Sequence, residues 1–378
     1  MSNYIVQGET LTALGDAIRA KTGNSQLLTL ADMTTVVNSD LRPMGFPDKM
    51  DLVYPNISLN SYALSTAIFG DGIWFTGAGN DVYISYDGFT WSHFTVDVSL
   101  GYVARAYANG VWVNGDTETG ALYYSTDRCR TWTKCTIGTT KNINSVQHCN
   151  GHWYARCASE SKTYHSIDGK NFEAMTFTSV TGNVYYTNGV YMVGDVYGAD
   201  FAVYKSTDGV SFTKITNFPS EITHPSLQTY FNGIWIVRDV MSKAVCYSTD
   251  GGSTWSMFSE ISSINSISSF GGKAIMIHGN GLNFSISEDG LVWENITSNL
   301  PIDTSITKIS EFSASDNMLI IITDSNVFYY TLDLNTWYSK TIPDDFTSLI
   351  DVIYGGNTVM LNMLTSSKAR NIMCAKIV

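Results

Sequence analysis

Two arginines occupy positions from which they could bind an anion. Arg156 and Arg238 each stand five residues after the glycine of a short turn that recurs along the chain. In three other copies the equivalent position holds a glycine: Gly77, Gly115 and Gly194. An arginine guanidinium presents a rigid fork of N–H donors that fits a carboxylate, a sulfate or a phosphate. We therefore predict that both side chains bind an acidic group on a glycan; the alternative is a surface ion pair with a neighbouring acid.

Acidic, aromatic and imidazole side chains follow the arginines in the same parts of the repeat. Aspartates occupy the next position in three copies, and the nearby loops and connections add further polar residues. Exposed tyrosines can stack on sugar rings, although most of the 22 tyrosines are expected to be strand residues that face the interior. The predicted ligand-binding residues are Arg156, Arg238, Asp239, Asp116, Glu160, Asp195, Tyr197, Tyr102 and His224.

These residues belong to a repeat whose clearest part occurs seven times. Each copy of this Ser-x-Asp turn reads Ser, any residue, Asp, usually Gly, two or three variable positions and an aromatic, as in Ser85–Trp91. The last copy has Thr in place of Ser. The closing aromatics lie 41, 40, 40, 43, 38 and 44 residues apart. A period of about 40 residues without a helical pattern predicts a β-propeller.

A second turn signal precedes the Ser-x-Asp turns. Asn-Gly pairs recur at Asn109–Gly110, Asn150–Gly151, Asn188–Gly189 and Asn232–Gly233, and degenerate forms occur elsewhere. Asn-Gly supplies the positive φ angles of a type I′ turn, which joins two antiparallel strands. One repeat is therefore predicted to be strand, Asn-Gly turn, strand, variable loop, strand, Ser-x-Asp turn and strand, which makes a four-stranded blade.

The number of blades follows from the hairpins. Eight Asn-Gly-type hairpins are present when the weak ones are included, against seven Ser-x-Asp turns, and the last unit ends before its fourth strand. Residues 50–56 precede the first hairpin and can supply the missing strand by pairing with the C-terminal blade. We predict an all-β propeller of eight blades over residues 46–378; seven blades with an irregular closing sheet is the alternative.

The Ser-x-Asp-Gly-x-Thr-Trp string resembles the Asp-box of sialidase-like and sortilin-like propellers. The resemblance implies a propeller that binds its ligand on the face opposite the Asp-boxes. Each aspartate can cap its own turn by accepting backbone N–H groups, and calcium binding or catalysis is the alternative role. Repetition favours the structural role, which we predict for Asp87, Asp127, Asp168, Asp208, Asp250, Asp289 and Asp333.

An active site is not evident in the sequence. Sialidases of the resembling fold combine a Tyr-Glu nucleophile with three arginines, the first within an Arg-Ile-Pro string, and this chain contains no Arg-Ile-Pro. Serine-hydrolase and zinc-protease motifs are also missing, so we predict no catalytic residue, metal site or cofactor. The many acidic loop residues leave open a glycosidase that works with two carboxylates.

Residues 1–45 lack the repeat and predict a small helical hairpin. Thr10 or Thr12 can cap the first helix, and a second helical stretch follows. The sequence of residues 8–23, with residues 28–33 after it, resembles a short helical module of tail and baseplate proteins of bacteriophages and prophages. The resemblance implies attachment to other tail or baseplate proteins or to sister copies, and hence a homo-oligomer. A dimerisation hairpin without a viral role is the alternative.

Composition restricts the possible partners. The chain has 378 residues, of which 44% are hydrophobic, and a formal net charge of −12. An acidic chain without a basic cluster favours neither nucleic acid nor an anionic membrane as a partner. No apolar stretch reaches the length of a transmembrane helix, and the N-terminal residues show no signal peptide. The six cysteines have no metal-ligand spacing, and we expect no structural disulfide.

These features together predict a receptor-binding protein of a phage or phage-like tail tip or baseplate. We expect it to be made in the bacterial cytoplasm, to reside in the virion, and to recognise a bacterial surface polysaccharide or other glycan. The binding surface is expected on the face opposite the Asp-boxes. The alternatives are a glycan-cleaving depolymerase on the same face and a purely structural baseplate propeller.

Overall fold

The computed structural model confirms the predicted all-β propeller. The chain divides into two units, residues 51–376 and residues 1–50 with 377–378, and all described residues belong to the first unit. The helical hairpin predicted for residues 1–45 therefore lies outside the described residues. Within the described residues no helix is long and apolar enough to cross a membrane. The structure describes residues 52–53, 67–101, 104–116, 119–178, 182–195, 201–261, 263–279, 283–297, 309–315, 318–323, 327–342, 346–355, 358–365 and 370–376.

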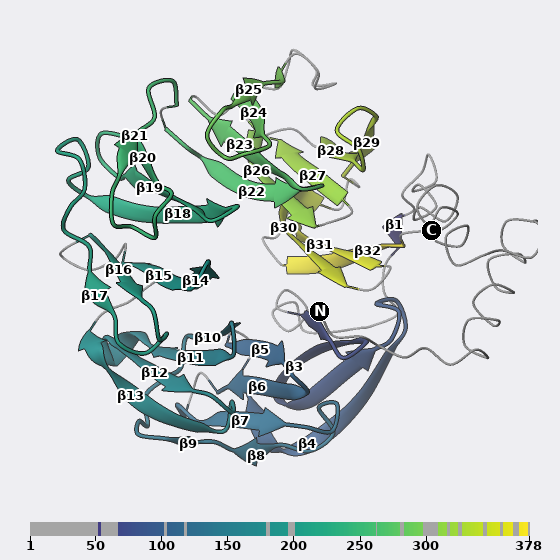
Figure 1. The fold of residues 1–378 in the computed structure, drawn as a ribbon. Coiled ribbons are helices and arrows are strands. Elements are labelled where there is room, and N and C mark those ends of the chain that lie inside the picture. The colour runs from purple at the N-terminus through teal and green to yellow at the C-terminus, as the bar shows by residue number, and fades with distance from the viewer. Residues whose placement is uncertain are drawn as a thin grey trace, which may run out of the picture. The chain divides into compact units, whose positions relative to one another are not determined.

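Eight sheets, one per blade, follow one another along the described chain (Figure 1). Blade 1 contains β2 (Ile68–Gly70), β3 (Ile73–Ser85) and β4 (Trp91–Leu100). The long strand β3 takes the place of two strands, because its first residues pair with β2 and its last residues with β4. Blade 2 contains β5 (Arg105–Ala108), β6 (Val111–Gly115), β7 (Leu122–Ser125) and β8 (Thr133–Lys134). Blade 3 contains β10 (Ser145–Cys149), β11 (His152–Cys157), a 3-10 turn η1 (Ala158–Glu160), β12 (Lys162–Ser166) and β13 (Asn171–Thr178), with β9 (Thr136–Ile137) added parallel to β13.

The next four blades repeat the same antiparallel order. Blade 4 contains β14 (Val184–Thr187), β15 (Val190–Asp195), β16 (Ala202–Ser206) and β17 (Thr213–Lys214). Blade 5 contains β18 (Pro225–Phe231), β19 (Ile234–Asp239), β20 (Val245–Ser248) and β21 (Ser256–Met257). Blade 6 contains β22 (Ser266–Phe270), β23 (Lys273–His278), β24 (Asn283–Ser287) and β25 (Glu294–Asn295). Blade 7 contains β26 (Ile309–Ser315), β27 (Met318–Thr323), β28 (Val327–Thr331) and β29 (Trp337–Thr341).

Blade 8 is assembled from both ends of the propeller. It contains β30 (Phe346–Gly355), β31 (Thr358–Thr365) and β32 (Arg370–Lys376), and its fourth strand is β1 (Leu52–Val53). In the pairing of β1 with β32, Leu52 lies opposite Ala375 and Val53 opposite Cys374. The first strand of each blade contacts the first strand of the next, and β30 of blade 8 contacts β2 of blade 1, so the blades form a closed ring (Figure 1).

The Asn-Gly turns have the backbone that their sequence predicts. Asn109 and Gly110 have φ angles of 51° and 80°, and the other three Asn-Gly pairs have similar positive values. Positive φ at both central residues is the requirement of a type I′ turn, whose twist matches that of the flanking strands. These turns place the first two strands of each of these blades in register, with Trp112 opposite Tyr107 in blade 2.

The hydrophobic core is divided into clusters between neighbouring blades. Successive strand residues point to opposite faces of a blade, so one strand serves two clusters. On β6, Trp112 packs with Phe75 of blade 1, whereas Val113 joins a cluster with Trp153 of blade 3. The same arrangement recurs between blades 3 and 4, 4 and 5, 5 and 6, 6 and 7, and 8 and 1. Blades 1 to 6 are thus held by apolar contacts on both faces.

Replacing Trp112 with alanine should lower the free energy of unfolding by about 3–5 kcal/mol, the usual cost of deleting a large buried aromatic side chain. Trp112 is 1% exposed, and its ring lies 5.5 Å from the ring of Phe75. Urea unfolding followed by tryptophan fluorescence and circular dichroism measures the change. The control is Val292→Ala, because Val292 is 74% exposed and its truncation should change stability by less than about 0.5 kcal/mol. Equal losses in both variants would contradict the packing described here.

Candidate binding site

The Ser-x-Asp turns form a repeated hydrogen-bond network on one face of the ring. In blade 4, the Ser206 hydroxyl donates to Asp208 Oδ1 at 2.7 Å and accepts the N–H of Gly209 at 3.0 Å. Asp208 Oδ1 also accepts the N–H groups of Val210 and Ser211 at 2.9 and 2.7 Å. In every one of the seven turns the aspartate Oδ1 accepts one hydroxyl and two backbone N–H groups. The aspartates therefore cap their own turns.

The capping bonds keep these carboxylates ionised. The N–H groups of Ser211 and Val210 hold the pKa of the Asp208 carboxyl well below its usual range. The pKa is also lowered for the aspartates of the other six turns. A carboxylate that accepts several hydrogen bonds is stabilised in its charged form. The geometry of the seven aspartates is thus explained by the turns themselves.

Three of the predicted ligand-binding aspartates are buried. Asp195 and Asp239 end the second strand of their blades and Asp116 directly follows it; Asp116, Asp195 and Asp239 are 2%, 3% and 0% exposed. The carboxylate of Asp239 accepts four backbone N–H groups, those of Thr223, His224, Met241 and Ser242. Ligand binding requires exposure, which these carboxylates lack, so we leave all three out of the proposed binding surface. Their positions at strand ends did not show this burial; around Asp239 it comes from the segments of residues 223–224 and 241–242.

Arg238 and His224 lie beside this buried carboxylate on blade 5. Arg238 is half-buried, and its Nη1 donates to the carbonyl oxygen of Ile264 at the entrance to blade 6. Burial lowers the pKa of the guanidinium. The His224 imidazole lies 2.9 Å from the Thr223 hydroxyl and packs edge-on against Phe201. Arg238 therefore uses one of its N–H donors on a backbone carbonyl oxygen that leads into the next blade.

Arg156 occupies the corresponding position between blades 3 and 4. It is half-buried and lines a cavity of about 20 Å³ together with Ser145, Gln147, Thr163 and Asn183. That volume suits about one water molecule. Gln147 closes the cavity by exchanging two hydrogen bonds, of 2.6 and 2.8 Å, with the backbone of Val184 in blade 4. In this structure the small cavity has room for the tip of a ligand and not for a sugar ring.

Glu160 lies near Arg156 on blade 3. Its carboxylate accepts the Tyr164 hydroxyl at 2.8 Å and the Thr139 hydroxyl at 2.9 Å. The hydrogen bond from Tyr164, followed by that from Thr139, lowers the pKa of Glu160. Arg156 and Glu160 are thus two candidates on different sides of blade 3: Arg156 borders Val184 of blade 4, whereas the Glu160 partner Tyr164 packs in the cluster between blades 2 and 3. Tyr102 and Tyr197 lie outside the described residues.

The sequence pattern did not single out Arg105, which is a buried cation. Arg105 is 7% exposed, and its guanidinium donates to the Thr76 hydroxyl at 3.0 Å and to the carbonyl oxygens of Gly77 and Gly101 at 2.7 and 2.8 Å. It also lies over the ring of Phe75, 5.3 Å from the centroid. Burial lowers its pKa to about 9, so it remains charged at neutral pH. Because its partners are mostly backbone carbonyls, no side-chain spacing in the sequence points to it.

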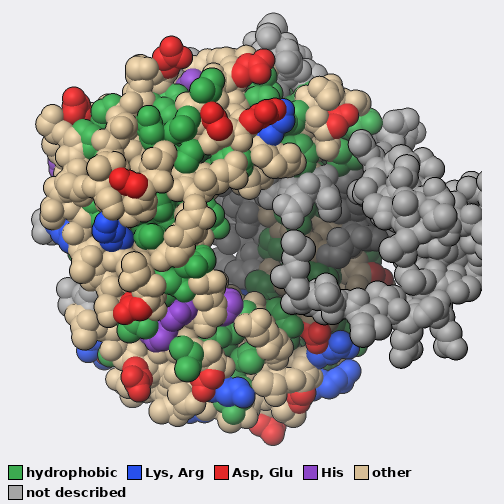
Figure 2. Space-filling view, viewed as in Figure 1, with side chains coloured by type: hydrophobic (Ala, Val, Ile, Leu, Met, Phe, Trp, Pro, Cys, Tyr) green, Lys and Arg blue, Asp and Glu red, His purple; other side chains and the backbone are tan. Residues whose placement is uncertain are grey.

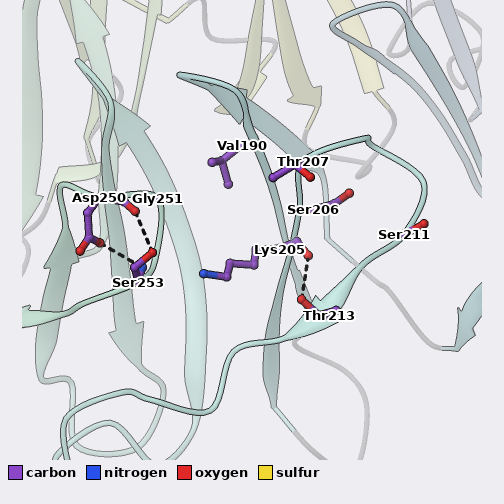
Figure 3. A pocket seen from close by; sticks show the side chains of 9 residues that line it. All are labelled: Val190, Lys205, Ser206, Thr207, Ser211, Thr213, Asp250, Gly251 and Ser253. Atoms are coloured by element: carbon purple, nitrogen blue, oxygen red, sulfur yellow. Dashed lines mark hydrogen bonds between the residues drawn. The ribbon is translucent and has the colours of Figure 1, made fainter.

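Lys205 is the second cation that the sequence pattern did not single out. It precedes the serine of the fourth Ser-x-Asp turn, where six other copies have Ile84, Tyr124, His165, Tyr247, Ile286 and Tyr330. When the seven copies of the turn are aligned, only the fourth has a lysine at this position. Figure 3 shows Lys205 extending from β16 toward the Ser-x-Asp turn of blade 5, into a cavity of about 300 Å³.

The described residues supply groups for reversible binding of a polar ligand. They contain no cluster of three or more His, Cys, Asp or Glu side chains suited to a metal ion. Figure 2 shows acidic and basic side chains scattered over the viewed face, not gathered into one patch. Individual arginines and lysines at the blade junctions are therefore the cationic groups to consider.

Comparison with solved structures identifies β-propellers of similar fold. The computationally designed Ika8 protein matches with a TM-score of 0.57 and 11% identity, over 87% of this chain and 100% of its own. YCF48 bound to D1 peptide matches with a TM-score of 0.51 and 12% identity, over 87% and 95%. BamB from Moraxella catarrhalis matches with a TM-score of 0.52 and 11% identity, over 86% and 98%. At this identity the likeness concerns the fold alone. No protein-family model matches the sequence, and no curated protein matches it.

The lowered pKa of Asp208 predicts a pH-dependent contribution to stability. A carboxyl whose pKa is lower in the folded state stabilises the fold above its unfolded pKa, near 4, and this contribution is lost as pH falls through the folded value. Asp208→Asn should therefore lower the melting temperature at pH 7, and its difference from wild type should shrink below about pH 4. Thermal melts between pH 7 and pH 3 measure this difference.

The matched control is Asp97→Asn, which removes the same charge from an exposed position on β4 outside the turns. Its melting temperature should follow wild type across the pH range. A constant difference between Asp208→Asn and wild type at all pH values would show that the carboxylate charge does not support the turn.

Proposed function

We propose that this propeller is the receptor-binding part of a phage or phage-like tail-tip or baseplate protein and that it recognises a bacterial surface glycan. The observation that carries the proposal is the difference between the two ends of the blades. At one end, seven similar turns have carboxylates occupied by backbone N–H groups. At the other end the described polar side chains differ from blade to blade, with Arg156 and Glu160 in blade 3 and His224 and Arg238 in blade 5, as a surface that selects one ligand requires.

Blade 3 supplies the principal polar groups of the proposed binding surface. Arg156 and Glu160 are each half-buried, so part of each side chain remains accessible. A glycan carboxylate or sulfate can meet the Arg156 guanidinium in a charge-assisted hydrogen bond. His224 and Arg238 of blade 5 are also half-buried and complete the described part of this surface. Binding by one copy is expected to be weak and to gain strength from several copies in one virion.

The Ser-x-Asp turns and residues 1–45 supply the virion part of the proposal through their resemblances. The turns have the capping geometry expected of Asp-boxes, which occur in sialidase-like and sortilin-like propellers. The N-terminal segment resembles the helical module of phage tail and baseplate proteins. In this proposal that segment attaches the chain to the tail or to sister copies, while the propeller contacts the host. Neither nucleic acid nor membrane insertion has a part in it.

The test measures retention of purified protein on immobilised surface polysaccharides from a panel of bacteria. Wild type should be retained on at least one polysaccharide, and Arg156→Ala should weaken retention about tenfold, as expected for the loss of one charge-assisted hydrogen bond. The control is Arg130→Ala, which removes an exposed arginine whose guanidinium lies over Phe94 on the Ser-x-Asp side. Its retention should equal that of wild type.

The length of the polysaccharide after incubation, measured by mass spectrometry, separates binding from cleavage. Uncut polymer supports a receptor-binding protein. Shortened polymer contradicts this proposal and supports a depolymerase. Absence of retention on every polysaccharide contradicts glycan recognition and supports a structural baseplate propeller.

A further inference from the structure

The cavity beside Lys205 forms part of a groove between blades 4 and 5, on the side of the Ser-x-Asp turns. The main cavity measures about 300 Å³, and a neighbouring cavity of about 220 Å³ shares Val190, Asp250 and Gly251 with it. A volume of about 300 Å³ is at the lower end of the range for small-molecule sites and suits a single sugar ring. The main cavity is lined by Val190, Lys205, Ser206, Thr207, Ser211, Thr213, Asp250, Gly251 and Ser253 (Figure 3).

The Lys205 ammonium has donors available to a ligand. A lysine ammonium has three N–H donors, and the Gly252 carbonyl oxygen takes one at 3.2 Å. Among the described residues, no carboxylate forms an ion pair with it. Lys273, at another cavity on the same side, is in contrast paired with Glu288 at 3.1 Å. Lys205 is thus a cation facing open space without a carboxylate partner in the described part of the chain.

The carbonyl that accepts Lys205 occupies a position that the closing tryptophan bonds in two other turns. In blades 1 and 2 the closing tryptophan donates its indole N–H to the carbonyl three residues earlier, at 2.9 and 3.0 Å. In blade 5 that carbonyl belongs to Gly252 and accepts Lys205, while the buried Nε1 of Trp255 has no partner among the described residues. Trp293 and Trp337 also lack such a partner, but only in blade 5 does a described lysine take the carbonyl. A polar residue that breaks the local pattern is a feature of functional sites.

The walls of the groove add hydroxyl groups and one carboxylate. Thr207, Ser211, Thr213 and Ser253 are exposed. The hydroxyls of Ser253 and Thr213 donate to the carbonyl oxygens of Asp250 and Lys205, at 3.1 and 3.3 Å, and can still accept a hydrogen bond from a ligand. Asp250 Oδ2 accepts the Thr254 hydroxyl at 2.7 Å and retains capacity for another donor. Its negative charge disfavours a simple anion close to it. A ligand with a carboxylate at one end and hydroxyls at the other satisfies both the lysine and the aspartate.

We propose that this groove binds a carboxylated sugar of the hexuronic acid class. The sugar carboxylate meets Lys205 Nζ, and its ring hydroxyls face Asp250, Ser253 and Thr207. The site lies on the side of the Ser-x-Asp turns and goes beyond the surface of Arg156. It rests on the proposed function only in the choice of a sugar as ligand; the cavity and the lysine are independent of it.

The test is a titration of ¹⁵N-labelled protein with glucuronic acid, with glucose as the neutral comparison. Glucuronic acid should shift the indole N–H resonance of Trp255, because Trp255 closes the turn that supplies Asp250, Gly251 and Ser253 to the groove; the resonance is assigned from the Trp255→Phe spectrum. Lys205→Met should weaken glucuronic acid binding about tenfold, because it removes a charge-assisted hydrogen bond. Lys205→Arg should restore most of the affinity, and glucose should bind wild type and Lys205→Met alike.

The matched control is Lys214→Met on the same blade. Thr213 lies opposite Lys205 in the sheet and Lys214 opposite Tyr204, so Lys214 points to the other face of blade 4. This variant should bind glucuronic acid like wild type. Equal weakening by both methionine variants, or no response to glucuronic acid, would overturn the proposal. The Arg156 retention experiment tests the proposed function separately. If Lys205→Met is retained on a polysaccharide like wild type, the proposed function still stands, whatever the glucuronic acid titration shows.

Discussion

Packing of each blade against the next is the interaction on which the rest of this structure depends. A four-stranded blade exposes two apolar faces and has no interior of its own, so it is stable only between two neighbours. Trp112 and Val113 illustrate the division, because these adjacent residues belong to different clusters. The ring closes for the same reason: a terminal blade without a neighbour would leave one face in water.

The same constraint explains why the candidate site residues lie at blade junctions. A Cβ atom on Gly194 would lie 3.2 Å from Leu227 Cβ of blade 5, so the next blade occupies that space. Arg156 and Arg238 fill the equivalent junctions with a long polar side chain, and backbone carbonyls of neighbouring blades become available as partners. A junction that admits a cation is more polar and less tightly filled than one closed by glycine. Chemical variety in this fold is thus greatest where two blades meet.

Features set by local sequence were predictable, and features set by folding of the loops were not. The blades and the turns follow from Asn-Gly and Ser-x-Asp patterns, whose geometry depends on a few adjacent residues. The burial of Asp116, Asp195 and Asp239 could not be read from their places at strand ends, because it depends on other segments of the chain; Asp239, for example, is enclosed by Thr223 and His224. Lys205 was visible as a departure from the repeat, but its partner is the carbonyl of Gly252, a group that every residue carries. Side-chain types alone therefore could not reveal the groove.

The pairing of β1 with β32 has a mechanical consequence. Residues 1–50 precede β1 in the chain, so tension applied through them reaches the propeller at Leu52 and Val53. Those residues are hydrogen-bonded to the last strand of the domain, and the force enters blade 8 before it reaches blade 1. The point where residues 1–50 join the propeller and the seam of the ring are one structural element. A pull on residues 1–50 is therefore a test of ring closure.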